Sequence, residues 1–291
     1  MICHASQRRT LGFQRARRGL TLLELVVVIA ILAALAGILV PLLPNVIFKA
    51  HASAGATNLG EIAKAVQLFN VENGNSYPNQ LDNLANSSGL LSYVPTDGTS
   101  LTTDALNAND VQALAGGNGQ PGCGITAVAQ IVASKSDGTW SPTFNPYDLA
   151  SGTSPSTIMT PIPYGATSGP TAAFLNPAVA AAKLGATNNG VERYVVFGLG
   201  KFATCVGQTM DEAPVWYNPT AGQDPDQVYC RFGLVFQTVG FTATTTYSGG
   251  TPSTTYAANP FPVAKLIGVI EFASFGTMTK DDNLSFYYSL Q

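Results

Sequence analysis

The strongest hydrophobic pattern in the chain is a long run near its start. Residues 25–48 read LVVVIAILAALAGILVPLLPNVIF and contain no Asp, Glu, Lys or Arg. A helix needs about 20 apolar residues to cross the hydrocarbon core of a bilayer. This run is apolar on every side, which is typical of a lipid-facing helix. We therefore expect a transmembrane or assembly helix over residues 20–48 rather than a buried helix of a soluble core.

The helix is expected to continue past this run with only one apolar face. Apolar and small residues recur there at steps of three and four positions: Ala52, Gly55, Leu59, Ile62, Val66 and Phe69. Asn73-Gly74 is a typical helix stop. Residues 20–72 would form a spine about 80 Å long, with its amphipathic half over residues 49–74. We expect this half to dock on a sheet.

Strand patterns appear late in the chain. Alternate apolar positions in Tyr194–Leu199 and in Arg231–Gln237 predict strands with one buried face. Lys265–Phe275 and Leu284–Tyr288 are further candidates. An early helix followed by late strands predicts an α+β fold, in which a long N-terminal hydrophobic spine helix carries a globular head with an antiparallel β-sheet over residues 75–291.

Two uncharged or weakly patterned regions interrupt this picture. Residues 85–190 are rich in Gly, Ser, Thr, Asn and Pro, and we expect loops and short strands there, with a short helix over Ala172–Leu184. Gly240–Pro260 is rich in Thr, Ser and Gly, and its composition favours a flexible loop.

Charge is scarce and unevenly placed. Only 11% of residues are charged, against about 25% in a typical soluble domain. Five of the 14 basic residues lie in the first 18 positions, which hold no acid: Arg8, Arg9, Arg15, Arg17 and Arg18. Without residues 1–19 the chain has 9 Lys and Arg against 17 Asp and Glu, a net charge of −8. This balance disfavours a nucleic-acid-binding head, whereas a basic segment before an apolar run is a targeting pattern.

Two residues do not suit a simple membrane anchor. Glu24 directly precedes the uncharged run, and Pro41 lies near the far end of this run. A carboxylate within a membrane costs a few kcal/mol and normally has a partner or a function. A proline removes one backbone hydrogen bond and bends a helix.

Residues 18–25, RGLTLLEL, followed by the apolar helix and Pro41, resemble the N-terminus of a type IV prepilin or a type II secretion pseudopilin. The resemblance implies that a prepilin peptidase removes residues 1–19 by cutting after Gly19 and methylates the new amino terminus of Leu20. It also implies that Glu24 neutralises this amine in a neighbouring subunit, and that Pro41 is the helix proline of the family.

The resemblance implies a function and a location. We expect a structural subunit of a type II secretion pseudopilus or a type IV pilus, anchored in the inner membrane by a single span with a periplasmic head. Its partners would be homologous subunits, the prepilin peptidase and an inner-membrane assembly platform. An alternative is a membrane-tethered or secreted binding domain that uses the segment only for export, because Ala34-Leu35-Ala36 would let signal peptidase cut before Gly37.

Catalytic groups are sparse. The two histidines are His4, in the leader, and His51, alone on the spine helix, so neither a Ser-His-Asp arrangement nor a histidine zinc cluster is expected. We expect no enzymatic activity and no cofactor. Calcium is a weaker alternative at two acidic segments that are better explained as solvated turns: Asp224 with Asp226, and Asp281 and Asp282 with Asn283.

The cysteines allow two interpretations. Cys205 and Cys230 flank a loop between two predicted strands. A disulfide there would stabilise an exported head by roughly 3 kcal/mol. The alternative is that Cys123, Cys205 and Cys230 are three buried thiols.

Overall fold

The computed structural model describes residues 21–40, 43–131, 158–216, 228–248, 251–273 and 276–289. The chain divides into two compact units, Met1–Ile47 and Phe48–Gln291. The described helices are α1 (Leu22–Leu39), α2 (Leu43–Glu72), α3 (Ala108–Ala115), α4 (Pro177–Leu184) and α5 (Lys280–Ser289). The described strands are β1 (Leu81–Asn83), β2 (Ala85–Asn86), β3 (Gly89–Leu90), β4 (Leu101–Asn107), β5 (Ala127–Gln130), β6 (Met159–Pro161), β7 (Ser168–Leu175), β8 (Arg193–Gly198), β9 (Phe232–Ser248), β10 (Thr251–Ala273) and β11 (Gly276–Met278).

The expected spine consists of two helices. Helix α1 ends at Leu39, where Val40 forms its C-cap and donates its N–H to the carbonyl of Ala36. Helix α2 begins at Leu43. Pro41 follows the cap in sequence and has no N–H with which to continue the helical ladder. Residues 41 and 42, between the two helices, lie outside the described residues, so the bend expected at Pro41 stays a prediction.

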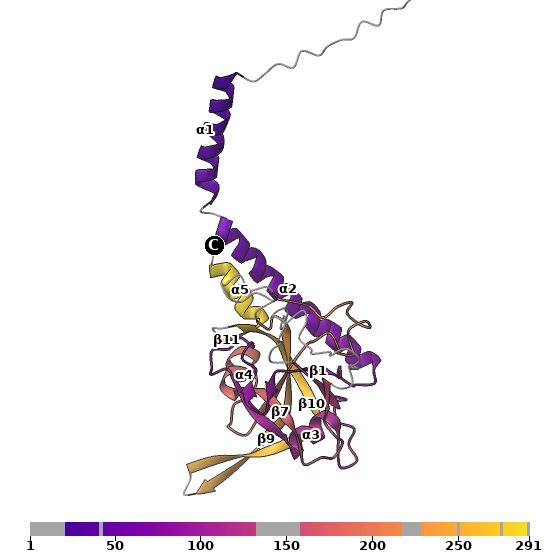
Figure 1. Cartoon of the computed structure of the whole chain (residues 1–291). Coiled ribbons are helices and arrows are strands. Elements are labelled where there is room, and N and C mark those ends of the chain that lie inside the picture. Colours follow the sequence, from indigo (N-terminus) through magenta and orange to yellow (C-terminus); the bar gives the residue numbers. More distant parts are fainter. Residues whose placement is uncertain are drawn as a thin grey trace, which may run out of the picture. The chain divides into compact units, whose positions relative to one another are not determined.

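Helix α2 packs its predicted stripe onto the sheet (Figure 1). All six stripe residues are buried, and Val66 is completely inaccessible to solvent. The helix ends at Glu72, and the side chain of Asn73 donates to the carbonyl of Phe69 at 2.9 Å. Gly74 then adopts a φ of +63°, a left-handed conformation that favours glycine. The amphipathic helix and its stop are confirmed.

The sheet has nine strands and branches at β8. Its main order is β11-β10-β9-β8-β1-β5-β6, and β4 joins through β7, which also pairs with β8. All of these pairs are antiparallel except β1 with β5, which run parallel. The α+β class is confirmed. The sheet is antiparallel, as expected, except at this one pair, which makes it a mixed sheet.

Alternate residues of the central strands supply two cores, one on each face of the sheet. Val195 and Phe197 of β8 join α2 in the first core, whereas Tyr194 and Val196 of the same strand join the second. Neighbouring side chains point to opposite faces of a strand, so a nearly continuous apolar strand such as β8 serves both cores. The predicted buried faces of residues 194–199 and 231–237 are confirmed.

Three local predictions are wrong. Residues 284–288 lie in helix α5 rather than in a strand, and residues 172–175 belong to β7, so that α4 starts only at Pro177, after the N-cap Asn176. Residues 240–260 form a two-stranded ribbon of β9 and β10 instead of a flexible loop, and the ribbon projects from the sheet (Figure 1). Threonine and tyrosine favour strands, and this preference outweighs the low hydrophobicity of the segment.

The ribbon is largely exposed and keeps a regular register. The pairs run from Thr251 with Ser248 to Pro260 with Val239, without a shift between them. Pro252 and Pro260 both lie on β10 within this regular stretch.

One carboxyl group lies entirely inside the head, where β10, α2 and α5 meet. Glu271 on β10 is 0% exposed. Its Oε2 accepts a hydrogen bond of 3.0 Å from the side chain of Asn283 on α5, and its Oε1 has no hydrogen-bond partner. Burial raises the pKa of Glu271 from 4.5 to about 7, and the bond from Asn283 opposes this rise.

We expect the head to lose stability as the pH rises, and we expect Glu271→Gln to abolish this loss. A buried carboxyl with a raised pKa stabilises the head fully below the unfolded pKa of 4.5 and loses this contribution as the pH rises through about 7. The free energy of unfolding of the variant relative to wild type should therefore increase by about 3 kcal/mol between pH 4.5 and pH 8. Urea unfolding at both pH values measures it, with the exposed Glu72→Gln as a control; a pH-independent difference would contradict the assignment.

We expect two glycines of α2 to respond oppositely to alanine. A Cβ at Gly55 would lie 2.8 Å from Glu271 Oε1 and 3.2 Å from Asn283 Oδ1, whereas one at Gly60 would meet Lys280 Nζ at an ordinary 3.8 Å. Alanine favours a helix by about 1 kcal/mol over glycine. Gly60→Ala should stabilise the head by about this amount, and Gly55→Ala should destabilise it by about 1–2 kcal/mol through overpacking. Thermal unfolding of both variants tests this, and equal shifts would show that Gly55 has room.

Candidate functional site: the apolar helix α1

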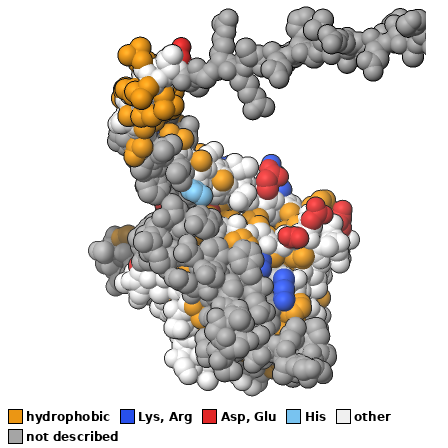
Figure 2. Space-filling view, turned by 45° about the horizontal axis from the view of Figure 1, so that its top comes forward, with side chains coloured by type: hydrophobic (Ala, Val, Ile, Leu, Met, Phe, Trp, Pro, Cys, Tyr) orange, Lys and Arg blue, Asp and Glu red, His pale blue; other side chains and the backbone are white. Residues whose placement is uncertain are grey.

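Helix α1 presents hydrophobic side chains in every direction. None of its residues is buried within the described part of the chain, and Figure 2 shows hydrophobic side chains covering this helix. Eighteen residues at 1.5 Å each give a length of about 27 Å, close to the roughly 30 Å of a bilayer core. By length and composition α1 is able to cross a membrane.

The start of α1 is fixed by a reciprocal pair of side-chain bonds. The hydroxyl of Thr21 accepts from the backbone N–H of Glu24 at 3.3 Å, and the Glu24 carboxylate accepts from the N–H of Thr21 at 2.9 Å. This capping box satisfies two N–H groups that the first turn of a helix leaves unbonded. It also holds a negative charge at the positive end of the helix dipole.

The capping bond occupies only part of the Glu24 carboxylate. Oε2 accepts the bond from Thr21, and the residue is exposed. A carboxylate accepts about four hydrogen bonds, so Glu24 is able to hold its own helix and to accept from a further cation at the same time. The arrangement is suited to receiving a positively charged group beside an apolar helix.

The remaining predicted processing and bending residues lie outside the described residues. These are Gly19, Leu20 and Pro41. The sequence reasoning missed Thr21, although its signal is visible: a threonine three positions before a glutamate, at the start of an apolar run, is a capping-box pattern.

The structure corresponds to the second interpretation of the cysteines. Cys205 and Cys230 are buried thiols that are not bonded to each other, as the alternative interpretation expected. The backbone of Cys230 pairs with that of Trp216, whose N–H donates to the carbonyl of Cys230 at 2.7 Å. Burial raises the pKa of Cys205 to about 11, so a thiol at this position stays protonated at neutral pH.

Of the two acidic segments considered for calcium, the structure describes one. Asp224 and Asp226 lie outside the described residues. Asp282 accepts from the N–H and the hydroxyl of Thr279 and pairs with Lys183 at 3.1 Å, while Asn283 donates to Glu271. Among the described residues, no group of three or more His, Cys, Asp or Glu is arranged to hold a metal ion.

Comparison with known proteins bears on α1 and not on the head. Residues 14–40 match the family model of the prokaryotic N-terminal methylation motif. No curated protein and no solved structure matches the chain. The matched segment contains Gly19, Leu20, Glu24 and the whole of α1. The chain thus carries at its N-terminus the signature of type IV pilin and pseudopilin precursors.

Proposed function

We propose that the mature chain is a structural subunit of a type II secretion pseudopilus or a type IV pilus. The observation that carries this proposal is α1: a helix with no buried residue, headed by an exposed carboxylate, inside the methylation motif. Leaving one Leu or Ile side chain in water rather than burying it costs about 1.5–3 kcal/mol. Such a helix needs lipid before assembly and the helices of neighbouring subunits after it.

Charge pairing supplies the specificity that hydrophobic contact lacks. Cleavage after Gly19 creates a positive amine on Leu20, four residues before Glu24. Glu24 of one subunit pairs with the Leu20 amine of another in the apolar filament core. Two opposite charges attract strongly in a low-dielectric medium, and a shift of register leaves both unpaired. The pair therefore selects one packing of otherwise uniform apolar helices.

The sequence around α1 supports an orientation and a set of partners. The basic leader stays in the cytoplasm, since a Lys- and Arg-rich flank is retained there, so the head lies in the periplasm of a protein anchored in the inner membrane. The prepilin peptidase, an assembly platform and homologous subunits are its partners. The role is mechanical: we propose no enzymatic activity, no cofactor and no nucleic-acid binding, in keeping with a net charge of −8 after residue 19.

The first test is the mature N-terminus. We expect protein purified from its native host to begin at Leu20 with an N-methyl group, as shown by mass spectrometry of the N-terminal peptide. A terminus at Gly37 would instead show cleavage by signal peptidase and would favour the exported binding domain, because most of α1 would be lost.

The second test separates the charge of Glu24 from its capping role. Glu24→Gln keeps an oxygen for the Thr21 N–H but removes the charge, whereas Thr21→Ala removes the hydroxyl of the cap and keeps the charge. Loss of one partner from a buried ion pair costs about 3–5 kcal/mol. Glu24→Gln should therefore be processed and membrane-bound but reduced at least about tenfold in sheared filaments.

Thr21→Ala serves as the matched control and should still appear in sheared filaments. Immunoblots of the membrane and sheared fractions measure both variants. Equal incorporation of Glu24→Gln and wild type would rule out the pairing role, and a defect confined to Thr21→Ala would assign Glu24 to helix capping alone.

A further inference from the structure

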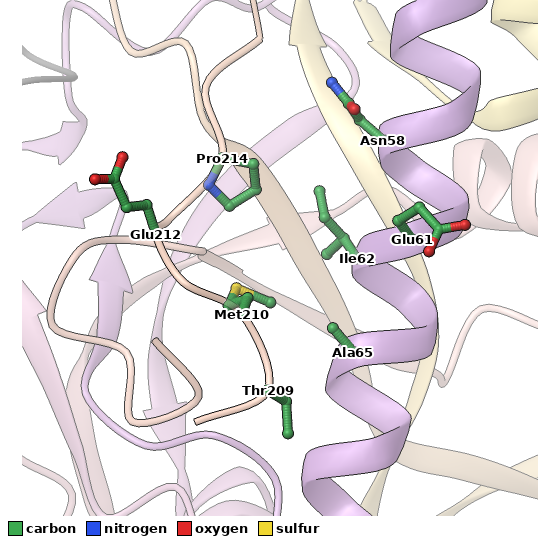
Figure 3. Close-up of a pocket in the computed structure, with 8 residues that line it drawn as sticks. All are labelled: Asn58, Glu61, Ile62, Ala65, Thr209, Met210, Glu212 and Pro214. Atoms are coloured by element: carbon green, nitrogen blue, oxygen red, sulfur yellow. The ribbon is translucent and has the colours of Figure 1, made fainter. Parts of the chain in front are cut away.

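A groove runs along one side of α2, between the helix and the loop of residues 209–214 (Figure 3). It has a volume of about 250 Å³. Figure 3 shows Ile62 projecting from α2 toward the loop that carries Met210 and Pro214. The lining residues are Asn58, Glu61, Ile62, Ala65, Thr209, Met210, Glu212 and Pro214. We call this the acidic groove.

The acidic groove has an apolar floor and a negative rim. Ile62, Ala65, Met210 and Pro214 supply the apolar surface. Glu61 and Glu212 line the groove, and both are exposed. Glu61 pairs with Lys64 at 2.8 Å, whereas none of the ion pairs in the described part of the chain involves Glu212. The groove is therefore suited to a long side chain that ends in a cation.

A second groove, of about 420 Å³, lies beside α2 against α4, β10 and α5. Three lysines line it, Lys64, Lys183 and Lys280, with one acid, Asp281. Lys183 pairs with Asp282 at 3.1 Å. Lys280 is exposed, and no ion pair among the described residues involves it. We call this the lysine groove.

The two grooves lie on opposite sides of α2. The acidic groove uses helix positions 58, 61, 62 and 65, and the lysine groove uses positions 59, 60, 63 and 64. At about 100° per residue these sets point in directions roughly 180° apart. Lys64, at the edge of the lysine groove, pairs with Glu61 of the acidic groove in the same head at 2.8 Å. Lys280 and Glu212 line grooves on opposite sides of the helix, and none of the ion pairs in the described part of the chain joins them.

We propose that the acidic groove of one copy receives Lys280 from the lysine groove of a second copy of this chain. Opposite charge on two separated surfaces of one molecule is complementary between molecules. The contact is head-to-tail, because each copy uses one side of α2 to receive and the other to donate. Repeated contacts of this kind build open helical polymers when they do not close into a ring. The inference deepens the proposed filament function and rests on it.

The chemistry of the contact follows from the lysine side chain. Its four-carbon stem covers the apolar floor while its ammonium group reaches the rim at Glu212. A single exposed ion pair is weak, so the contact selects the neighbour and its register rather than holding the polymer together. The packing of α1 supplies the main attraction.

A charge exchange tests the pairing in full-length protein expressed with its assembly machinery. Glu212→Lys alone and Lys280→Glu alone should each lower the amount of sheared subunit about tenfold, because each sets like charges opposite one another. The double variant Glu212→Lys/Lys280→Glu restores the opposite charges and should return to within about twofold of wild type. Glu72→Lys and Lys265→Glu are matched controls, since both residues are exposed and line neither groove.

Assembly of both single variants at the wild-type level would overturn the inference, and so would a double variant as defective as the singles. A second measurement covers loss of folding. Copies with Glu212→Cys and copies with Lys280→Cys are co-expressed and treated in membranes with a bismaleimide whose spacer matches the span of a Lys–Glu pair, because that span exceeds the reach of a direct disulfide. A cross-linked dimer is expected only when both variants are present. If no such dimer forms while wild type still gives sheared filaments that begin at Leu20, the inference is overturned and the proposed function stands. Wild type without such filaments overturns the proposed function.

Discussion

A water-exposed apolar helix is the constraint on which the molecule depends. Helix α1 has no buried residue in the described chain, although its sequence is almost entirely aliphatic. Its burial must therefore come from lipid or from other molecules, since the hydrophobic effect strongly disfavours leaving such a surface in water. The capping box at Thr21 and Glu24 fixes where this helix begins. A defined helix start places the Glu24 carboxylate at a fixed position beside the first turn.

The head buries its apolar side chains within itself and pairs a buried carboxylate with an arginine of its own. Its two cores cover both faces of the sheet, and α2 closes one of them. Arg193 on β8 binds the buried Asp110 of α3, with a shortest distance of 2.9 Å, and also contacts the exposed Asp104 at 3.0 Å. A buried carboxylate paired in this way ties α3 to the sheet. Neither core of the head contains a residue of α1.

The sequence predicts the parts of this fold that have strong periodicity. The stripe of α2 and the buried faces of β8 and β9 follow directly from steps of three to four and of two residues. The sequence does not predict the ribbon at residues 240–260, because exposed threonines carry no burial pattern. It does not predict α5 either, because the residues FYYS favour a strand locally, whereas the cap formed by Thr279 and Asp282 favours a helix. Within the site, Glu24 was identified from sequence, whereas both grooves depend on the distant loop 209–214 and on α5, which no local pattern brings beside α2.

The prolines of the ribbon limit how it meets other strands. Pro252 and Pro260 are eight residues apart, so their nitrogens share one edge of β10. The ladder with β9 continues past Pro252 and reaches Pro260 without a shift, and a proline within a strand is normally found with its nitrogen on the free edge, where no ladder bond is lost. An added strand would lack two bonds there. Along an exposed, uncharged ribbon, missing donors oppose the addition of a further strand and therefore disfavour growth into a continuous cross-β sheet.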